Sequence, residues 1–233
     1  HLHRVIEILR AGSRQRIDNL RARTTQLADW DLAPTPLQPD PVAGEGKQKP
    51  RPGPRGPIER RHVKRDPRRL KQIGDEGEAW ALAAVMGPLL AMDQPALEGA
   101  LGELSDALAA AYKGDCIDEL RSKADHAASP WVDDDDRAEA LAEFLHLSRT
   151  SDMFGCDLLG WLRPDPDDDP KPLFLEVKSS LGRQALISTH EWDEATRLGE
   201  RYAILVVTRD RSGDPSGMDL LVDPVALHQE QRR

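Results

Sequence analysis

The spacing of apolar residues changes several times in the last two-thirds of the chain, and each change predicts a different element. Apolar residues at helical spacing are ended by Gly87-Pro88, and an insert rich in Ala and Leu follows over residues 88–150. Short apolar runs bounded by Gly, Pro, Asp or Ser indicate strands. In chain order we expect a helix at 74–86, helices at 95–127 and 133–147, strands at 154–161 and 173–177, a helix at 188–198, strands at 202–207 and 218–222, and a short helix from 223.

This order of elements predicts an α/β sandwich, in which helices flank a mixed sheet of four or five strands. The first two strands are joined by a polar loop rich in Asp and Pro, which indicates an antiparallel hairpin. After the hairpin, Ser188-Thr-His-Glu191 fits a capping box that starts a helix. The apolar residues of that helix that are expected to face the sheet are Trp192, Ala195 and Leu198.

A proline-rich stretch separates this domain, which we place at residues 70–233, from an N-terminal part. Eight of the 24 residues from Pro34 to Pro57 are proline, so residues 34–69 are expected to form an extended, semi-rigid linker. Residues 1–33 carry an apolar stripe at helical spacing and predict an amphipathic docking helix. Because the linker holds this helix away from the domain, another domain or subunit is expected to cover its stripe. The chain begins with His1 rather than Met, which we interpret as a sign that it is a piece of a longer protein.

Charge is unevenly distributed along the chain. Residues 1–72 contain 17 Lys and Arg against 8 Asp and Glu, whereas the remaining residues contain 15 against 33, so a basic arm precedes an acidic body. The arm could follow a phosphate backbone, or it could be a solvated linker, because no aromatic residue is interleaved with its basic residues for stacking on bases. The candidate contacts to nucleic acid are Arg60, Arg61, Lys64, Arg65, Arg68 and Arg69.

The composition argues against several other classes of protein. Cys116 and Cys156 are far apart and form no Cys-X-X-Cys pair, which argues against a zinc site or a secreted disulfide framework and favours a reduced, cytoplasmic protein. No apolar run approaches the length of about eighteen residues that spans a bilayer, so no membrane partner is expected. The run Asp133–Asp136 lacks the alternating ligands and the glycine of a calcium loop, and we interpret it as a favourable helix N-terminus.

Charged residues in the second predicted strand carry the chemistry of the chain. Strand alternation places Glu176 and Lys178 on one face and Leu173, Leu175 and Val177 on the other. A buried carboxylate and a buried ammonium group cost desolvation energy, so such a pair indicates ion pairing, metal binding or catalysis. The alternative is a strand that reaches the surface with two solvated charges at its end.

Asp157 lies on the neighbouring strand of the expected hairpin and can therefore stand beside Glu176. Two carboxylates on adjacent strands repel each other unless a cation lies between them, and hard oxygen ligands suit Mg²⁺ or Mn²⁺. Lys178 would stand next to the ion, where it could orient or help deprotonate the attacking water, or stabilise charge on a phosphate. The pattern therefore predicts a Mg²⁺ or Mn²⁺ site at Asp157 and Glu176.

Asp157, a spacer of eighteen residues and then Glu176-Val177-Lys178 resemble the core motif of the PD-(D/E)XK nuclease superfamily, with Cys156 in the place of the proline. Further motifs follow in an order similar to one branch of that superfamily, the domain at the C-terminus of the plant NO VEIN protein. The resemblance covers residues 70–227 and implies a restriction-endonuclease-like three-layer sandwich, here with a longer helical insert than expected. The further motifs are Gly74-Asp-Glu-Gly-Glu78, Ser188-Thr-His-Glu-Trp192 and Tyr202-Ala-Ile-Leu-Val-Val207.

The resemblance also implies roles for single residues. Glu78 matches a Gly-Glu of the related domains and would join Asp157, Glu176 and Lys178 in catalysis, with the three carboxylates as metal ligands. The alternative is that Glu78 is a surface carboxylate on a helix. Glu76, which a helix places on a different face from Glu78, is then the second candidate.

Two classes of function remain open. In the first, the chain is a Mg²⁺-dependent endonuclease acting on nucleic acid, with DNA as the expected substrate. The resemblance implies a module of a larger defence or repair system, with a helicase or ATPase partner for residues 1–33. In the second, the same fold only binds nucleic acid or a protein partner. The complete set of Asp, Glu and Lys favours the nuclease, the acidic body slightly favours the binding module because it repels DNA, and His190 is a secondary candidate for a substrate contact.

Overall fold

The part of the chain that the structure describes is built on one mixed sheet. The computed structural model describes residues 67–164, 167–180, 186–210 and 215–230. Its elements are, in order, α2 (Pro67–Leu90), α3 (Gln94–Ala111), α4 (Asp115–Ala128), α5 (Asp134–Leu145), α6 (Leu147–Thr150), the 3₁₀ turn η1 (Asp152–Phe154), β1 (Leu158–Leu162), β2 (Lys171–Ser180), α7 (Thr189–Leu198), the 3₁₀ turn η2 (Gly199–Arg201), β3 (Tyr202–Arg209), β4 (Pro215–Val222) and α8 (Pro224–Glu230).

The strands lie in the order β1-β2-β3-β4. As predicted, β1 and β2 form an antiparallel hairpin, in which Leu158 pairs with Leu175. β2 and β3 are parallel, with Glu176 opposite Ile204, and α7 lies in the crossover between them. β3 and β4 are antiparallel. The prediction of a mixed sheet is therefore confirmed, with four strands in the described ranges.

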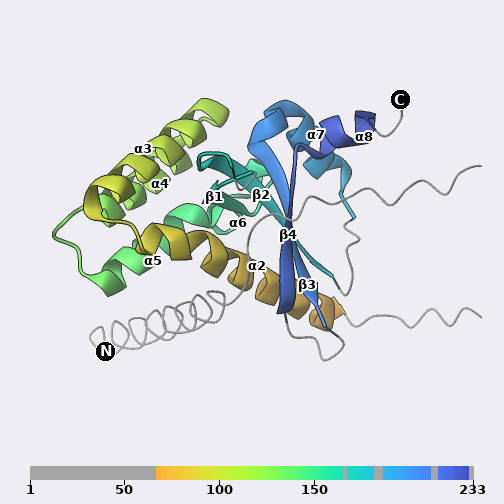
Figure 1. Cartoon of the computed structure of the whole chain (residues 1–233), viewed down its shortest axis with the longest axis horizontal. Helices are drawn as coiled ribbons and strands as arrows, with labels where there is room; N and C mark the ends of the chain where they lie inside the picture. The colour runs from red at the N-terminus through yellow and green to blue at the C-terminus, as the bar shows by residue number, and fades with distance from the viewer. Residues whose placement is uncertain (1–66, 165–166, 181–185, 211–214, 231–233) are drawn as a thin grey trace, which may run out of the picture.

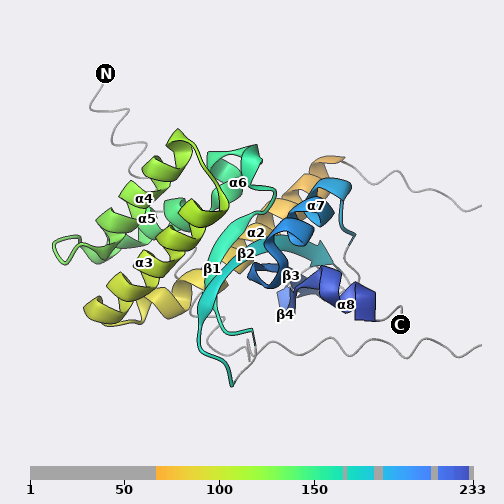
Figure 2. The ribbon, with the colours of Figure 1, turned by 90° about the horizontal axis from the view of Figure 1, so that it is seen from above.

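Helices cover both faces of this sheet, as Figures 1 and 2 show together. α2 packs on the face that carries Ser179, whose side chain lies against Gly77 of the helix. α7 packs on the opposite face, where Glu191 reaches Lys178. Ser179 and Lys178 are neighbours in β2, and successive side chains of a strand point to opposite faces, so the two helices lie on opposite sides. The result is a sandwich of three layers.

α2 extends beyond the predicted helix at both ends. It begins at Pro67, a position where proline is favourable because the first N–H of a helix has no partner within the helix. The predicted end at Met86 is wrong, since the helix includes Pro88 and continues to Leu90. Pro88 has no N–H and so costs the helix one hydrogen bond to the preceding turn, but the next residue, Leu89, is completely buried. Packing of this turn therefore outweighs the local stop signal.

The predicted helical insert consists of α3, α4, α5 and α6, and it packs beside β1 (Figure 1). The single helix predicted at 95–127 is wrong, because residues 112–114 separate α3 from α4. Gly114 has a φ of +130°, which a residue with a side chain rarely adopts, and the chain turns there. Among the described helices, none is long and apolar enough to cross a membrane.

Two helix starts are where their capping residues predict them. Asp133 accepts hydrogen bonds from the backbone N–H groups of Asp135 and Asp136, at 3.0 and 2.9 Å, and so caps α5. Ser188 and Glu191 form the predicted capping box at the start of α7. The aspartate run is therefore a helix N-terminus, as predicted.

The boundaries of the first hairpin differ from the prediction. The strand predicted from residue 154 starts only at Leu158, because η1 and then Gly155, with a φ of +57°, turn the chain first. β2 is longer than predicted, since Lys171 pairs with Leu162 across the hairpin. Asp157 consequently follows a turn and lies directly before β1.

Candidate functional site

The turn before β1 brings Asp157 alongside β2. The backbone N–H of Asp157 donates to the carbonyl of Leu175 at 2.9 Å, which continues the pairing of the two strands by one residue. The side-chain Oδ2 of Asp157 accepts a hydrogen bond of 2.8 Å from the backbone N–H of Val177. Two backbone groups of β2 therefore hold Asp157, and they place it beside Glu176.

Lys178 is paired with two carboxylates. Its Nζ lies 2.6 Å from Oε1 of Glu176 in the same strand and 3.0 Å from Oε2 of Glu191 in α7. The same oxygen of Glu191 accepts a 2.8 Å hydrogen bond from the backbone N–H of Ser188, so the helix cap and the ion pair share one atom. Glu176 is only 7% exposed. The alternative of two solvated charges at the end of a strand is therefore wrong.

Burial raises the pKa of both acids on the hairpin. For Asp157, burial and the charge of Glu78 outweigh the hydrogen bond from Val177 and the charge of Lys178, and the pKa rises to about 6. For Glu176, burial and the charge of Asp157 raise the pKa to about 8 despite the hydrogen bond from Lys178. Two buried negative charges side by side are unfavourable. A cation between them would offset both their repulsion and the cost of their burial.

Lys178 carries its positive charge at neutral pH. Burial alone would lower its pKa, but the hydrogen bonds and charges of Glu176 and Glu191 outweigh burial and move the pKa above its ordinary value. A lysine in this state donates hydrogen bonds and does not act as a base. Of the roles that the sequence leaves open for Lys178, the structure favours orientation of groups and stabilisation of negative charge.

Glu76 and Glu78 lie in α2 but have different partners. Oε2 of Glu78 is 3.0 Å from Nε2 of the buried His146. Oε2 of Glu76 is 2.9 Å from Nη1 of the buried Arg209. The charge of Glu78 raises the pKa of Asp157, so Glu78 is the acid of α2 that acts on Asp157. The contact with Arg209 explains Glu76 as part of the packing of α2 on the sheet.

Glu78, Asp157 and Glu176 each use one carboxylate oxygen in an internal hydrogen bond. Among the described residues, the second oxygen of each has no hydrogen-bond partner; these atoms are Oε1 of Glu78, Oδ1 of Asp157 and Oε2 of Glu176. Asp157 and Glu176 therefore fit Mg²⁺, which is commonly held by one or two carboxylates and several waters. Within the described ranges no three His, Cys, Asp or Glu side chains lie close enough to hold one ion together. A direct bond from Glu78 to the ion stays a prediction.

Sequence reasoning did not assign His146 or Glu191 to the site. His146 follows α5 and lies between Leu145 and Leu147, both completely buried. A single histidine inside an apolar run is the signal that could have indicated a buried polar contact. Glu191 offered no separate signal, because its place in the capping box already explained it.

Other candidate residues lie at the surface or beyond the described residues. His190 is exposed at the start of α7, beside Gly155. Arg68 and Arg69 are exposed at the start of α2. Four of the candidate contacts to nucleic acid, and the predicted docking helix at 1–33, lie outside the described residues; the four are Arg60, Arg61, Lys64 and Arg65.

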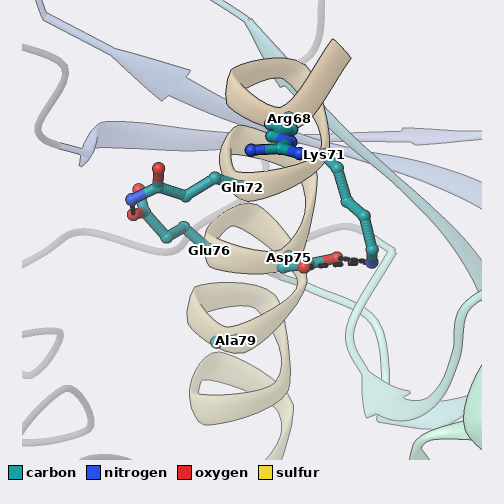
Figure 3. Close-up of a pocket in the computed structure, with 6 residues that line it drawn as sticks. All are labelled: Arg68, Lys71, Gln72, Asp75, Glu76 and Ala79. Atoms are coloured by element: carbon teal, nitrogen blue, oxygen red, sulfur yellow. Dashed lines mark hydrogen bonds and ion pairs between the residues drawn. The ribbon is translucent and has the colours of Figure 1, made fainter.

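A pocket of about 340 Å³ lies along the first half of α2 (Figure 3). In it Nζ of Lys71 lies 2.9 and 3.1 Å from the two carboxylate oxygens of Asp75, four residues further along the helix. The pocket contains neither Asp157 nor Glu176, so it is not the candidate metal centre. Its lining residues are Arg68, Lys71, Gln72, Asp75, Glu76 and Ala79.

No protein-family model, curated protein or solved structure matches this chain. The likeness to PD-(D/E)XK nucleases therefore rests on the motif residues alone, and the function has to be argued from the geometry of the site.

Proposed function

We propose that this chain is a metal-dependent nuclease that hydrolyses phosphodiester bonds in nucleic acid, with DNA as the expected substrate, on a restriction-endonuclease-like fold. The observation that carries the proposal is that Asp157, directly before β1, meets Glu176 and Lys178 of the adjacent strand β2. Asp157 is bonded to the backbone beside Glu176 at 2.8 Å, and Glu176 lies 2.6 Å from Lys178. Two crowded carboxylates next to a charged lysine can bring a divalent cation and a phosphate together.

Asp157 and Glu176 would hold Mg²⁺ or Mn²⁺ through the oxygens that make no internal hydrogen bond, Oδ1 and Oε2. When bound there, the ion would act as a Lewis acid on a phosphate oxygen and would lower the pKa of a bound water. Lys178 has three N–H donors, and Glu176 and Glu191 take two of them. The third donor is left for a phosphate oxygen, whose negative charge it stabilises during the reaction.

Hydrolysis forms a bond between a water oxygen and phosphorus and breaks the bond from phosphorus to the leaving oxygen. The attacking water gives up a proton, and the leaving oxygen takes one from solvent. We assign the acceptance of the water proton to Oε1 of Glu78, which has no hydrogen-bond partner among the described residues. The side chain of Glu78 is 29% exposed, so water can reach it.

Cleavage of single- and double-stranded DNA and of RNA, in Mg²⁺ and in EDTA, tests this function. We expect the wild-type protein to cleave only with the divalent ion, and Asp157→Ala and Glu176→Ala to lose cleavage and Mg²⁺ binding. Lys178→Ala should bind Mg²⁺ and lose turnover. The control is Asp118→Ala, which removes an exposed carboxylate of α4 and should leave cleavage unchanged. Wild-type rates in Asp157→Ala would overturn the assignment.

Binding of the ion should also stabilise the folded protein. An ion that relieves the repulsion between Asp157 and Glu176 binds the folded state in preference to the unfolded state, so Mg²⁺ should raise the melting temperature. Asp157→Ala should abolish this increase, because it removes one of the two ligands. An equal increase in the variant would place the ion elsewhere.

Contacts of the basic arm with nucleic acid belong to the same proposal. Arg68 and Arg69 are exposed at the start of α2, as phosphate contacts need to be. Changing both to Gln should weaken binding of all sequences alike and reduce the slope of log affinity against log salt. An unchanged slope would make this part of the arm a solvated tether. The helicase or ATPase partner and the role in defence or repair rest on the resemblance alone.

One observation favours the second function, a module that binds without cleaving. Lys178 already has two carboxylate partners, so the group is a connected ion network even without a metal. If this alternative holds, no divalent ion will support cleavage by the wild-type protein, while nucleic acid or a protein partner will bind with the same affinity to Asp157→Ala.

A further inference from the structure

The corner between α5 and α6 contacts two of the acids of the candidate site. His146 is the single residue between α5 and α6, and Ser148 lies in α6. Nε2 of His146 lies 3.0 Å from Oε2 of Glu78, and the backbone N–H of Ser148 donates to the backbone carbonyl of Asp157 at 3.1 Å. A few consecutive residues of the helical insert therefore connect α2 with the turn before β1.

The hydrogen bond between His146 and Glu78 has a defined direction. A carboxylate oxygen accepts hydrogen bonds, so Nε2 of His146 carries the proton and donates it. His146 is only 3% exposed, and its neighbours Leu145 and Leu147 are completely buried, so the ring has little freedom to move. The bond takes Oε2 of Glu78 and leaves Oε1 as the oxygen available to water.

Hydrogen bonds and charges place this pair near Asp157, one of the two proposed metal ligands. The charge of Glu78 raises the pKa of Asp157, and the charge of a protonated His146 lowers it. Because such effects weaken with distance, both side chains lie near Asp157. Three elements distant in the sequence meet here: α2, the corner after α5 and the turn before β1.

A purely structural pair is the competing explanation, since α5 packs against α2. Such a pair would be expected to be enclosed at both ends. Here the His146 side chain is 4% exposed and the Glu78 side chain is 29% exposed. The pair is enclosed at the histidine and open at the carboxylate, which is the arrangement expected when one group holds another at the edge of a solvent-accessible site.

We propose that His146 is a positioning residue of this site: by donating to Oε2 of Glu78, it directs Oε1 toward the water next to Asp157. The inference rests on the proposed nuclease function and assigns to the helical insert a part in it. His146 contacts neither metal nor substrate in this assignment. It acts only through Glu78.

A matched pair of substitutions tests the proposal. His146→Gln keeps an N–H donor that can reach Glu78, whereas His146→Leu fills the space without a donor. We expect His146→Leu to lower kcat about 10- to 100-fold, the loss typical of residues that orient groups at a metal site, with little change in KM. His146→Gln should recover part of this loss. Mn²⁺ affinity, measured by calorimetry, should stay within about twofold of wild type in both variants, because Asp157 and Glu176 hold the ion.

A double-mutant cycle with Glu78→Gln separates positioning from packing. If His146 acts through Glu78, His146→Leu should cause no further loss of kcat in the Glu78→Gln background. Nitrogen NMR of the imidazole provides a readout that does not depend on cleavage: the signal should belong to the Nε2-protonated tautomer and should shift in Glu78→Gln.

Three results would overturn the inference. The first is a wild-type kcat in His146→Leu, and the second is a loss in the double variant equal to the product of the two single losses. The third is a melting temperature of His146→Leu that falls in proportion to its kcat and is not recovered in His146→Gln. If the wild-type protein cleaves no substrate with any divalent ion, the proposed function fails and the inference fails with it. If the wild-type protein cleaves and Asp157→Ala does not, but His146→Leu keeps the wild-type kcat, the proposed function stands and only the inference about His146 fails.

Discussion

Oδ2 of Asp157 accepts a 2.8 Å hydrogen bond from the backbone N–H of Val177, the residue that separates Glu176 from Lys178. The orientation of the Asp157 carboxylate is therefore set by the backbone of β2, and only proline at position 177 would remove the donor. Because the bond occupies Oδ2, Oδ1 is the oxygen without a hydrogen-bond partner among the described residues. A substitution at residue 157 can therefore remove the negative charge and keep the hydrogen bond.

Asp157→Asn should stabilise the metal-free protein at about pH 8, whereas Asp157→Ala should not. The asparagine carbonyl can accept the same hydrogen bond from Val177 and carries no charge. Because burial raises the pKa of Asp157 to about 6, the folded state disfavours the ionised carboxylate. We expect a gain of about 1–2 kcal/mol in the free energy of unfolding, measured in urea with EDTA. An Asn variant less stable than the Ala variant would contradict this.

Stability without metal should fall as the pH rises. The pKa of Glu176 is about 8 in the folded state against 4.5 ordinarily, so between these values the folded state binds more protons than the unfolded state. The free energy of unfolding therefore decreases as pH rises through this window. Asp157 adds a change of the same sign between 3.8 and about 6. Urea unfolding in EDTA at about pH 5 and about pH 8.5 should show this decrease, and Glu176→Gln should reduce it. Equal pH dependence in the two proteins would count against a raised pKa at Glu176.

Gly77→Ala should destabilise the contact between α2 and β2. A Cβ at this position would lie 2.8 Å from Cβ and 3.2 Å from Oγ of Ser179, so the helix or the strand has to move. We expect a loss of about 1–3 kcal/mol in urea unfolding. Cleavage should decrease as well, because Glu78 is the next residue.

Gly74→Ala in the same helix is the control for this substitution. A Cβ at Gly74 meets nothing within 4 Å, so alanine should raise the free energy of unfolding by up to about 1 kcal/mol through its higher helix propensity. Equal stability of the two alanine variants would mean that α2 does not approach β2 this closely in solution.

Tyr202→Phe should stabilise the protein slightly. The Tyr202 hydroxyl is completely buried and forms no hydrogen bond with any residue that the structure describes. Removing an unsatisfied hydroxyl should raise the free energy of unfolding by about 1 kcal/mol. The control is Tyr112→Phe, which removes a hydroxyl that donates to the backbone carbonyl of Phe154 and should lower it by about 1 kcal/mol. A similar loss in both variants would show that Tyr202 has a partner in solution.

Several features of the site could be predicted from the sequence because they depend on local geometry. The two-residue period of a strand places Glu176 and Lys178 on one face whatever the rest of the chain does. Asp133 and Ser188 cap their helices through backbone groups two or three residues away. Asp157 stands beside Glu176 because two consecutive strands form a hairpin, here through a long polar loop.

The partners of these residues were decided only by tertiary packing. His146 and Glu78 are 68 positions apart in the sequence, and Glu191 reaches Lys178 from a helix that packs on one face of the sheet. The end of α2 was decided in the same way, since burial of Leu89 carries the helix past Pro88. Local propensities set the direction in which a side chain points. The group that it meets depends on how α2, α5 and α7 pack on the sheet, and this packing results from many weak contacts that no short stretch of sequence encodes.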